Sequence, residues 1–304
     1  MTRQNRSKNR DLWLFFVIAF AWSWLLWMPE VLWGVSLYVA AFGPTVAAFL
    51  LTYINEGRNG TRELLKRGLD FRFRKIWLIP IFLLMPAIAG FSLLLAVLIG
   101  EPVPEIAVLS QPWIIIPAFF YILFLGGPLQ EEFGWRGYAL DRLQINYNAL
   151  VSSVILGFIW GLWHLPLFFM PRQEMYYNVP IWGFILGTIF FSIIFTWIYN
   201  NTGRSILAVL LLHTTGNLSH FIFPVDATTW GGLYSVILNV VVVIIILIMW
   251  GPKRMVREQH VKTTSLRFAQ ICLRQISHIP RTLGVIGFGT PETRRYYKEI
   301  IINL

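Results

Sequence analysis

The sequence carries little charge for its size. Charged residues make up only 13% of its 304 residues, while hydrophobic residues make up 56%. An ordinary soluble domain has about 25% charged residues, which cover its surface. The composition therefore excludes most soluble folds and predicts a chain that lies in lipid.

Cysteine is almost absent as well. The single cysteine, Cys272, excludes an internal disulfide framework and a metal centre built from cysteine ligands. The sequence also contains no His-Glu-x-x-His zinc motif, no Gly-x-Ser-x-Gly elbow and no Gly-x-Gly-Asp motif. Three common kinds of hydrolytic site are thereby excluded.

Long apolar runs are abundant. A helix needs about 20 apolar residues to cross a hydrocarbon core roughly 30 Å thick, and eight stretches meet this requirement. They are Leu12–Trp33, Val35–Ile54, Ile76–Ile99, Trp113–Leu129, Ala149–Met170, Ile181–Tyr199, Ser205–Phe223 and Trp230–Trp250. Because backbone groups in lipid must be satisfied internally, these stretches should be helices. The predicted fold is an all-α polytopic membrane protein with a bundle of about eight transmembrane helices.

The net charge of +10 is explained by topology. Basic residues gather before the first span, between the second and third, and after the fourth and eighth, which places them on one side. The opposite loops carry five acidic residues and a single arginine, Arg172. Basic loops face the cytoplasm, so both termini should be cytoplasmic. The partners of this charge are then anionic lipids, and no nucleic acid is needed.

The segments outside the spans are short. Residues 1–250 are predicted to form one membrane domain, and residues 251–304 form a basic cytoplasmic tail without an assigned role. Thr61–Leu69 and Leu266–Ile276 are expected to be short helices at the membrane surface, with Thr61 as the N-cap of the first.

Polar residues inside apolar spans are the informative ones, because a charge at the bilayer centre is costly. The first cluster holds Glu131, Glu132 and Arg136. Arg136 lies four residues after Glu132, so the two can pair on one helix face, while Glu131 points about 100° away. We expect the two carboxylates to differ in role, with one of them suited to act as a general base. The structural alternative is a charged helix end at the cytoplasmic boundary.

The other two clusters contain histidine. His164 follows Trp160 by four residues. It is either a functional group or, as the structural alternative, a neutral histidine packed on tryptophan. His213 and Asn217 share a helix face, which His220 extends by a turn. This stretch can also be read as helix-packing residues. Together, the three clusters can supply a base for water and a donor for a developing oxyanion, which peptide hydrolysis requires.

At these residues the sequence resembles the CPBP (Abi) family of CAAX proteases and bacteriocin-processing enzymes, which are intramembrane endopeptidases. The family pattern is Glu-Glu-x-x-x-Arg, Phe-x-x-x-His and His-x-x-x-Asn on successive helices of an eight-helix bundle. The resemblance covers about residues 110–220 and includes features typical of bacterial members, which implies a bacterial cell membrane. Trp160 stands where the family usually has phenylalanine, and we expect it to pack beside the site.

The resemblance implies a role for each residue. Glu131 matches the glutamate that activates water, and Glu132 with Arg136 matches a supporting ion pair. His164 matches the histidine that helps to hold the water. His213 and Asn217 match the pair that stabilises the oxyanion. The implied substrate is a peptide or membrane protein, prenylated or not.

Three questions stay open at this point. Glu131, His164 and His213 could form a catalytic zinc site with an open position, or act without a metal. A transporter with a carboxylate–histidine proton relay, or a non-catalytic immunity or scaffold protein of the same fold, could use the same groups. The depths of the three clusters also disagree, unless span four continues as helix toward Arg142 and prolines such as Pro128 and Pro166 bend their helices.

Overall fold

The computed structural model describes residues 3–177 and 179–257. The predicted surface helix Leu266–Ile276 and most of the predicted tail 251–304 lie outside these residues. Within the described ranges the chain is helical and contains no strand. The α-helices are α1 (Arg3–Trp33), α2 (Gly43–Arg67), α3 (Leu78–Leu98), α4 (Ala107–Ser110), α5 (Ile115–Leu125), α6 (Pro128–Gly134), α7 (Asp141–Asn146), α8 (Ala149–Trp163), α9 (Glu174–Tyr177), α10 (Ile181–Asn201), α11 (Ile206–Ile222) and α12 (Gly231–Trp250).

Shorter helical turns join these helices. Five are 3₁₀ turns and one, η4, is a π-helix between α6 and α7. They are η1 (Tyr38–Phe42), η2 (Lys75–Trp77), η3 (Pro112–Ile114), η4 (Trp135–Leu140), η5 (Leu165–Phe169) and η6 (Val225–Ala227).

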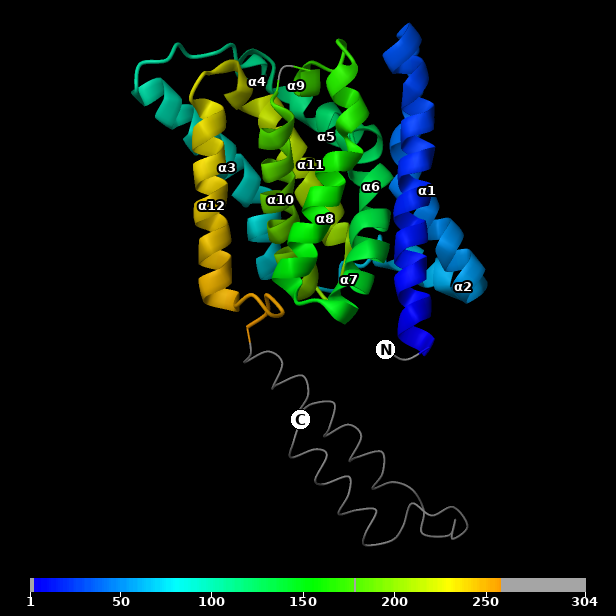
Figure 1. Cartoon of the computed structure of the whole chain (residues 1–304). Helices are drawn as coiled ribbons and strands as arrows, with labels where there is room; N and C mark the ends of the chain where they lie inside the picture. Colours follow the sequence, from blue (N-terminus) through cyan, green and yellow to red (C-terminus); the bar gives the residue numbers. More distant parts are fainter. Residues whose placement is uncertain (1–2, 178, 258–304) are drawn as a thin grey trace, which may run out of the picture. The chain divides into compact units, whose positions relative to one another are not determined.

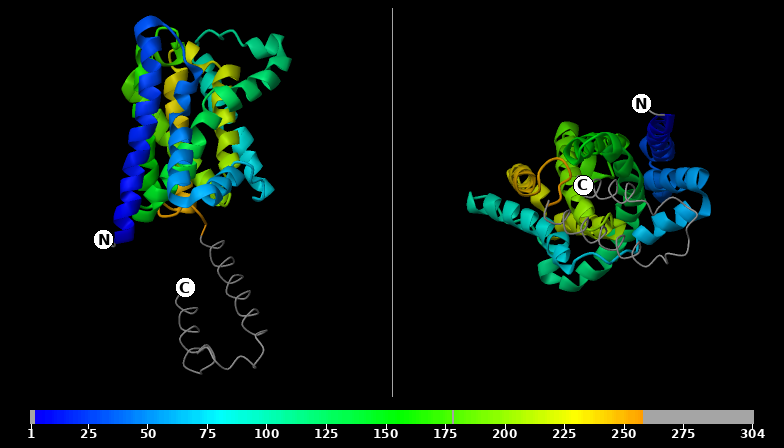
Figure 2. Two further views of the ribbon diagram at one scale, coloured as in Figure 1. Left: turned by 90° about the vertical axis from the view of Figure 1, so that its right-hand side faces the viewer. Right: turned by 90° about the horizontal axis from the view of Figure 1, so that it is seen from below.

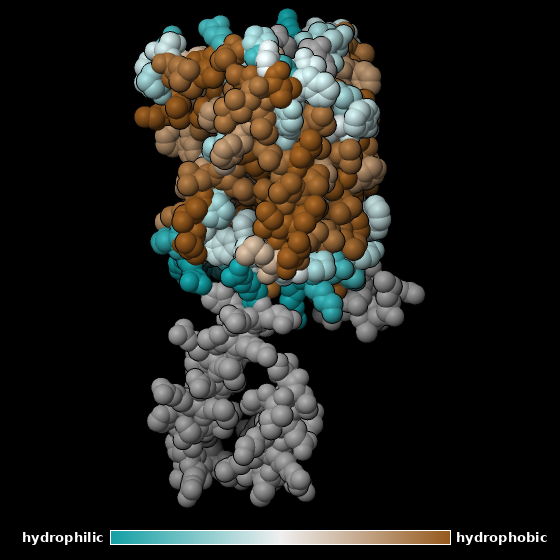
Figure 3. All heavy atoms as spheres, turned by 90° about the vertical axis from the view of Figure 1, so that its left-hand side faces the viewer, coloured by the Kyte–Doolittle hydropathy of each residue, from teal (hydrophilic) through white to brown (hydrophobic). Residues whose placement is uncertain are grey.

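The bundle has the predicted membrane character. Among the described residues, seven helices are long and apolar enough to cross a bilayer, and a bent pair, Pro112–Leu125 with Pro128–Asn146, makes up to eight. The long helices run side by side, with α1 and α2 on one flank and α12 on another (Figures 1 and 2). Figure 3 shows hydrophobic side chains over the middle of one face, with hydrophilic side chains at its ends. This confirms an all-α polytopic membrane protein.

The fourth span differs from its prediction as one run over Trp113–Leu129. Helix α5 ends at Leu125, the chain turns at Gly126 and Gly127, and α6 begins at Pro128 with a bend of 40°. Gly127 has φ of +111°, which a residue with a side chain rarely adopts. A hydropathy pattern does not register this break, because the apolar run Trp113–Leu129 continues across it.

After the break the helix continues, as expected, toward Arg142. Helix α6 leads into the π-helix η4 and then α7, which ends at Asn146. Glu131 therefore lies in the middle of a broken span and not at its cytoplasmic end, and Figure 1 places α6 between α5 and α7. The disagreement in depth between the clusters disappears.

Two other boundaries were wrong. The predicted helix Thr61–Leu69 is the last part of α2, which bends at Gly57 (φ +65°) and runs on to Arg67. Thr61 is not an N-cap, because its hydroxyl donates to the carbonyl of Gly57 within the helix. The fifth span ends as α-helix at Trp163, since Pro166 cannot continue the α-helical hydrogen bonds, and η5 follows.

Helix α6 lies between α2, α5 and α11. A Cβ atom on Gly134 would come within 2.5 Å of the backbone of Pro44, so the crossing of α2 with α6 requires a residue without a side chain. At one end of the bundle, Arg67 of α2 pairs with Asp141 at 3.0 Å and donates to the carbonyl of Gly137 inside η4. These contacts fix the segment that carries the acidic cluster.

The chain that follows α12 packs against the bundle. The carbonyls of Pro252 and Lys253 accept hydrogen bonds from the first backbone amides of α8, at Leu150 and Ala149. Met255 is fully buried. Figure 1 shows that α1 starts and α12 ends at the same end of the bundle. That this end faces the cytoplasm stays a prediction.

Candidate active site

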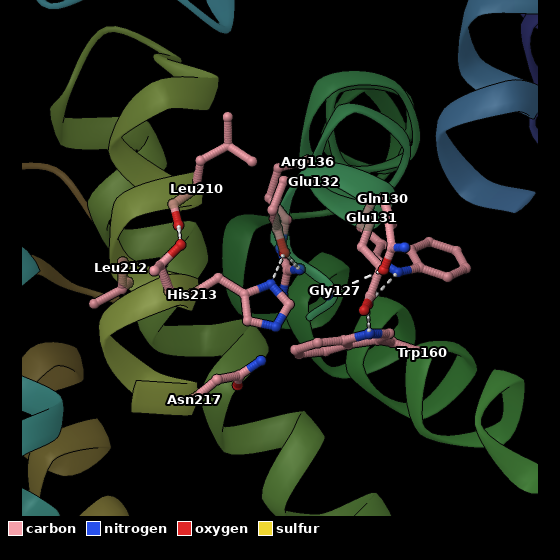
Figure 4. A network of polar contacts seen from close by, with 12 residues as sticks. Gly127, Gln130, Glu131, Glu132, Arg136, Trp160, Leu210, Leu212, His213 and Asn217 are labelled. Atoms are coloured by element: carbon pink, nitrogen blue, oxygen red, sulfur yellow. Dashed lines mark hydrogen bonds and ion pairs between the residues drawn. The ribbon is translucent and has the colours of Figure 1, made fainter. Parts of the chain in front are cut away.

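Glu131 is buried in the centre of the bundle. Its side chain is 4% exposed, although it carries a carboxylate. One carboxylate oxygen, Oε2, accepts hydrogen bonds from the indole Nε1 atoms of Trp135 at 3.2 Å and of Trp160 at 2.5 Å. The carboxylate is therefore held by donors from η4 and α8 (Figure 4).

Glu132 has different partners from its neighbour. Its Oε1 accepts from Arg136 Nη1 at 2.7 Å, and both side chains are fully buried. The Arg136 guanidinium lies 4.5 Å from the ring centroids of both Trp160 and Phe195. The predicted ion pair is confirmed, and its burial contradicts the alternative of a charged helix end at the membrane boundary.

His213 on α11 joins the same pair. Its Nδ1 lies 2.7 Å from Glu132 Oε1, and a carboxylate oxygen can only accept, so Nδ1 carries the hydrogen when Glu132 is ionised. This contact fixes the ring orientation across two elements. The other ring nitrogen, Nε2, faces the helix break at Gly127.

Asn217 lies one turn further along α11. Its Nδ2 donates to the carbonyl of Gly126 at 3.0 Å, which satisfies a backbone group left free by the broken helix. The amide of Gly127 on the other side of the break donates to the side chain of Gln130 at 3.1 Å. The break is thus stabilised by residues of the site itself.

Three polar groups converge over Gly127. A Cβ atom built on this glycine would lie 2.7 Å from Glu131 Oε1, 3.7 Å from His213 Nε2 and 3.8 Å from Asn217 Nδ2. Figure 4 shows these side chains around the break. A carboxylate, an imidazole and an amide therefore face one small space, which only a glycine leaves free.

His164 lies at the edge of this arrangement. Its Nδ1 is 2.9 Å from the carbonyl of Trp160, so this nitrogen carries a hydrogen, and its ring centroid is 6.0 Å from that of Trp160. Tyr176 stacks on it at 5.6 Å, and burial raises the pKa of that phenol well above its ordinary value. Among the described residues, no hydrogen bond joins His164 to Glu131 or His213. These contacts agree with the structural interpretation of His164, in which it is a neutral histidine packed on tryptophan.

The structure thus brings together Glu131, Glu132, Arg136, His213 and Asn217, with His164 next to them behind Trp160. His220 does not extend the stripe into the site, because it pairs with Asp226 at 3.3 Å. Sequence reasoning placed Trp160 beside the site but missed its hydrogen bond to Glu131, and it missed Trp135, Gln130 and Gly127. The only signal for the last two was the run Gly-Gly-Pro-Leu-Gln, which is typical of a helix start.

The candidate zinc ligands do not form a metal centre in this arrangement. Within the part of the chain that the structure describes, no group of three His, Cys, Asp or Glu side chains is placed to hold a metal ion. Glu131, His164 and His213 are therefore not gathered as one ligand set among the described residues.

The fold and this buried polar centre define a polytopic membrane protein with a glutamate–histidine site enclosed by its helices. Residues 112–219, which contain the whole site, match a family model described as type II CAAX prenyl endopeptidase Rce1-like. CAAX prenyl protease 2 of Methanococcus maripaludis is 29% identical over 235 residues, covering 71% of this chain and 86% of that protein. Both matches support the resemblance to the CPBP family of intramembrane proteases.

Proposed function

We propose that the protein hydrolyses a peptide bond of a CAAX-type substrate, a peptide or membrane protein with or without a prenyl group, in a bacterial cell membrane. The observation that carries the proposal is the convergence of Glu131 Oε1, His213 Nε2 and Asn217 Nδ2 over Gly127. Hydrolysis needs a base beside a donor for the oxyanion, and this set of side chains supplies both.

In the proposed reaction Glu131 takes a proton from water, and the water oxygen bonds to the carbonyl carbon of the substrate. The negative charge that develops on the carbonyl oxygen is stabilised by Asn217 and His213. The C–N bond then breaks, and the proton passes from Glu131 to the leaving amine. The products are a carboxylic acid and an amine, which exchange a proton to become a carboxylate and an ammonium, and Glu131 is again ionised.

Two supporting roles complete this proposal. For His213 to donate through Nε2 while Nδ1 donates to Glu132, both ring nitrogens must carry a hydrogen. Glu132 and Arg136 therefore act by holding this ring. With its Nδ1 hydrogen on the Trp160 carbonyl, a neutral His164 presents Nε2 as an acceptor, which suits a group that orients water. No step is routed through a metal.

Cleavage by the purified protein tests the proposal. A panel of membrane peptides and prenylated peptides should contain at least one that is cut by the wild type and left intact by Glu131→Ala. Incubation with a chelator should leave this cleavage unchanged. If cleavage persisted in Glu131→Ala, the assigned base would be wrong. If the chelator abolished cleavage and added zinc restored it, a metal-dependent mechanism would replace the metal-free one.

A further inference from the structure

Trp135 and Trp160 meet at one oxygen of the candidate base. Their indole N–H groups come from η4 and α8, which are separate in sequence, and both donate to Glu131 Oε2. Trp135 is fully buried and Trp160 is 3% exposed. Indole nitrogen is only a donor, so neither contact can reverse its direction.

This arrangement determines where the other oxygen points. The terminal torsion of a glutamate side chain is broad, so a free carboxylate would turn between many orientations. Two donors on Oε2 restrict that rotation and leave Oε1 toward Gly127, His213 Nε2 and Asn217 Nδ2. Trp160 also packs edge-on against His213, with ring centroids 5.5 Å apart.

We propose that Trp135 and Trp160 are positioning residues that orient the Glu131 carboxylate through their indole N–H groups, beyond filling space. The proposal rests on Glu131 being the base of the proposed hydrolysis. Each indole acts through Glu131 and touches no reacting atom.

The kinetic test removes each donor and keeps an aromatic ring. Trp160→Phe and Trp135→Phe should each lower kcat about 10- to 100-fold with little change in KM, because a misplaced catalytic group costs rate more than binding. Trp197→Phe is the matched control. Its buried Nε1 has no hydrogen-bond partner among the described residues, and its ring packs on Trp77 and Trp250, away from the site. Wild-type kcat in both donor variants would overturn the proposal.

A second measurement does not depend on activity. Trp160→Phe should lower the thermal denaturation midpoint in detergent more in the wild type than in a Glu131→Ala background, where no carboxylate is left to bind. Trp197→Phe should lower it equally in both. If Trp160→Phe lowered the denaturation midpoint equally in the wild type and in Glu131→Ala, the inference would be wrong even if cleavage were found. Unequal shifts without any cleavage would instead refute the proposed hydrolysis and leave the hydrogen bond standing.

Discussion

Two adjacent glutamates have different environments in this protein. Glu131 is held by indole donors and faces Gly127, whereas Glu132 is paired with Arg136 and His213. Helix periodicity was enough to predict the pairing of Glu132 with Arg136, because the two are four residues apart. It could not identify Trp160 as a partner of Glu131, since that contact joins residues 29 positions apart.

Amide substitutions should therefore separate the two carboxylates. Glu131→Gln should lower the cleavage rate by about 10²–10⁴-fold in a folded protein, because an amide cannot take a proton from water. Glu132→Gln should reduce the free energy of unfolding by about 3–5 kcal/mol, since it leaves the buried charge of Arg136 uncompensated. Peptide cleavage and thermal denaturation measure the two effects. Wild-type rates in both variants would contradict the mechanism.

The missing side chain of Gly127 leads to a separate prediction. Gly127→Ala should lower kcat by about 10²-fold or more, because its Cβ would enter the space between Glu131, His213 and Asn217. Gly100→Ala is the control. It adds similar backbone strain at φ +100°, and its Cβ would have nothing within 4 Å. Equal loss of activity in both variants would mean that strain, and not the filled space, is responsible.

At the level of whole elements, the existence of the helices could be predicted more precisely than their interruptions, of which only the bends at Pro128 and Pro166 were expected. Hydropathy located α3, α10, α11 and α12 within a few residues, because lipid demands long apolar helices. The break at Gly126 and Gly127 lies inside the apolar run Trp113–Leu129, so hydropathy does not mark it, although the Gly-Gly-Pro sequence is a turn signal. Irregular backbone at this depth is tolerated because it is buried in protein.

Substitutions on helix α11 distinguish a hydrolase from a proton-coupled transporter. Asn217 has no titratable proton, so a relay has little use for it, whereas an oxyanion donor is worth about 10²–10³ in rate. In a hydrolase, Asn217→Ala should lower turnover by that factor with substrate binding nearly unchanged. In a transporter the same variant should keep proton coupling, and His213→Ala should be the damaging one. Turnover, binding and proton uptake in proteoliposomes distinguish the two, and full activity in Asn217→Ala would remove this residue from the site.

At the scale of the whole molecule, orientation in the membrane follows from charge. If basic loops are cytoplasmic, a cysteine replacing the exposed Arg58 should be protected from an impermeant reagent in intact cells, once Cys272 has been replaced. A cysteine replacing the exposed Glu105 should be labelled. Labelling in the reverse pattern would invert the orientation of the entire bundle.

The contact between the chain after α12 and the start of α8 has a practical consequence for shortening the protein. Pro252 and Lys253 supply acceptors for amides of the helix that carries Trp160 and ends next to His164. A stop codon placed directly after Trp250 would therefore disturb a helix that is distant in sequence and close to the reaction. A deletion that keeps residues through Met255 would spare it, so the natural limit for trimming lies past the last membrane span and not at its end.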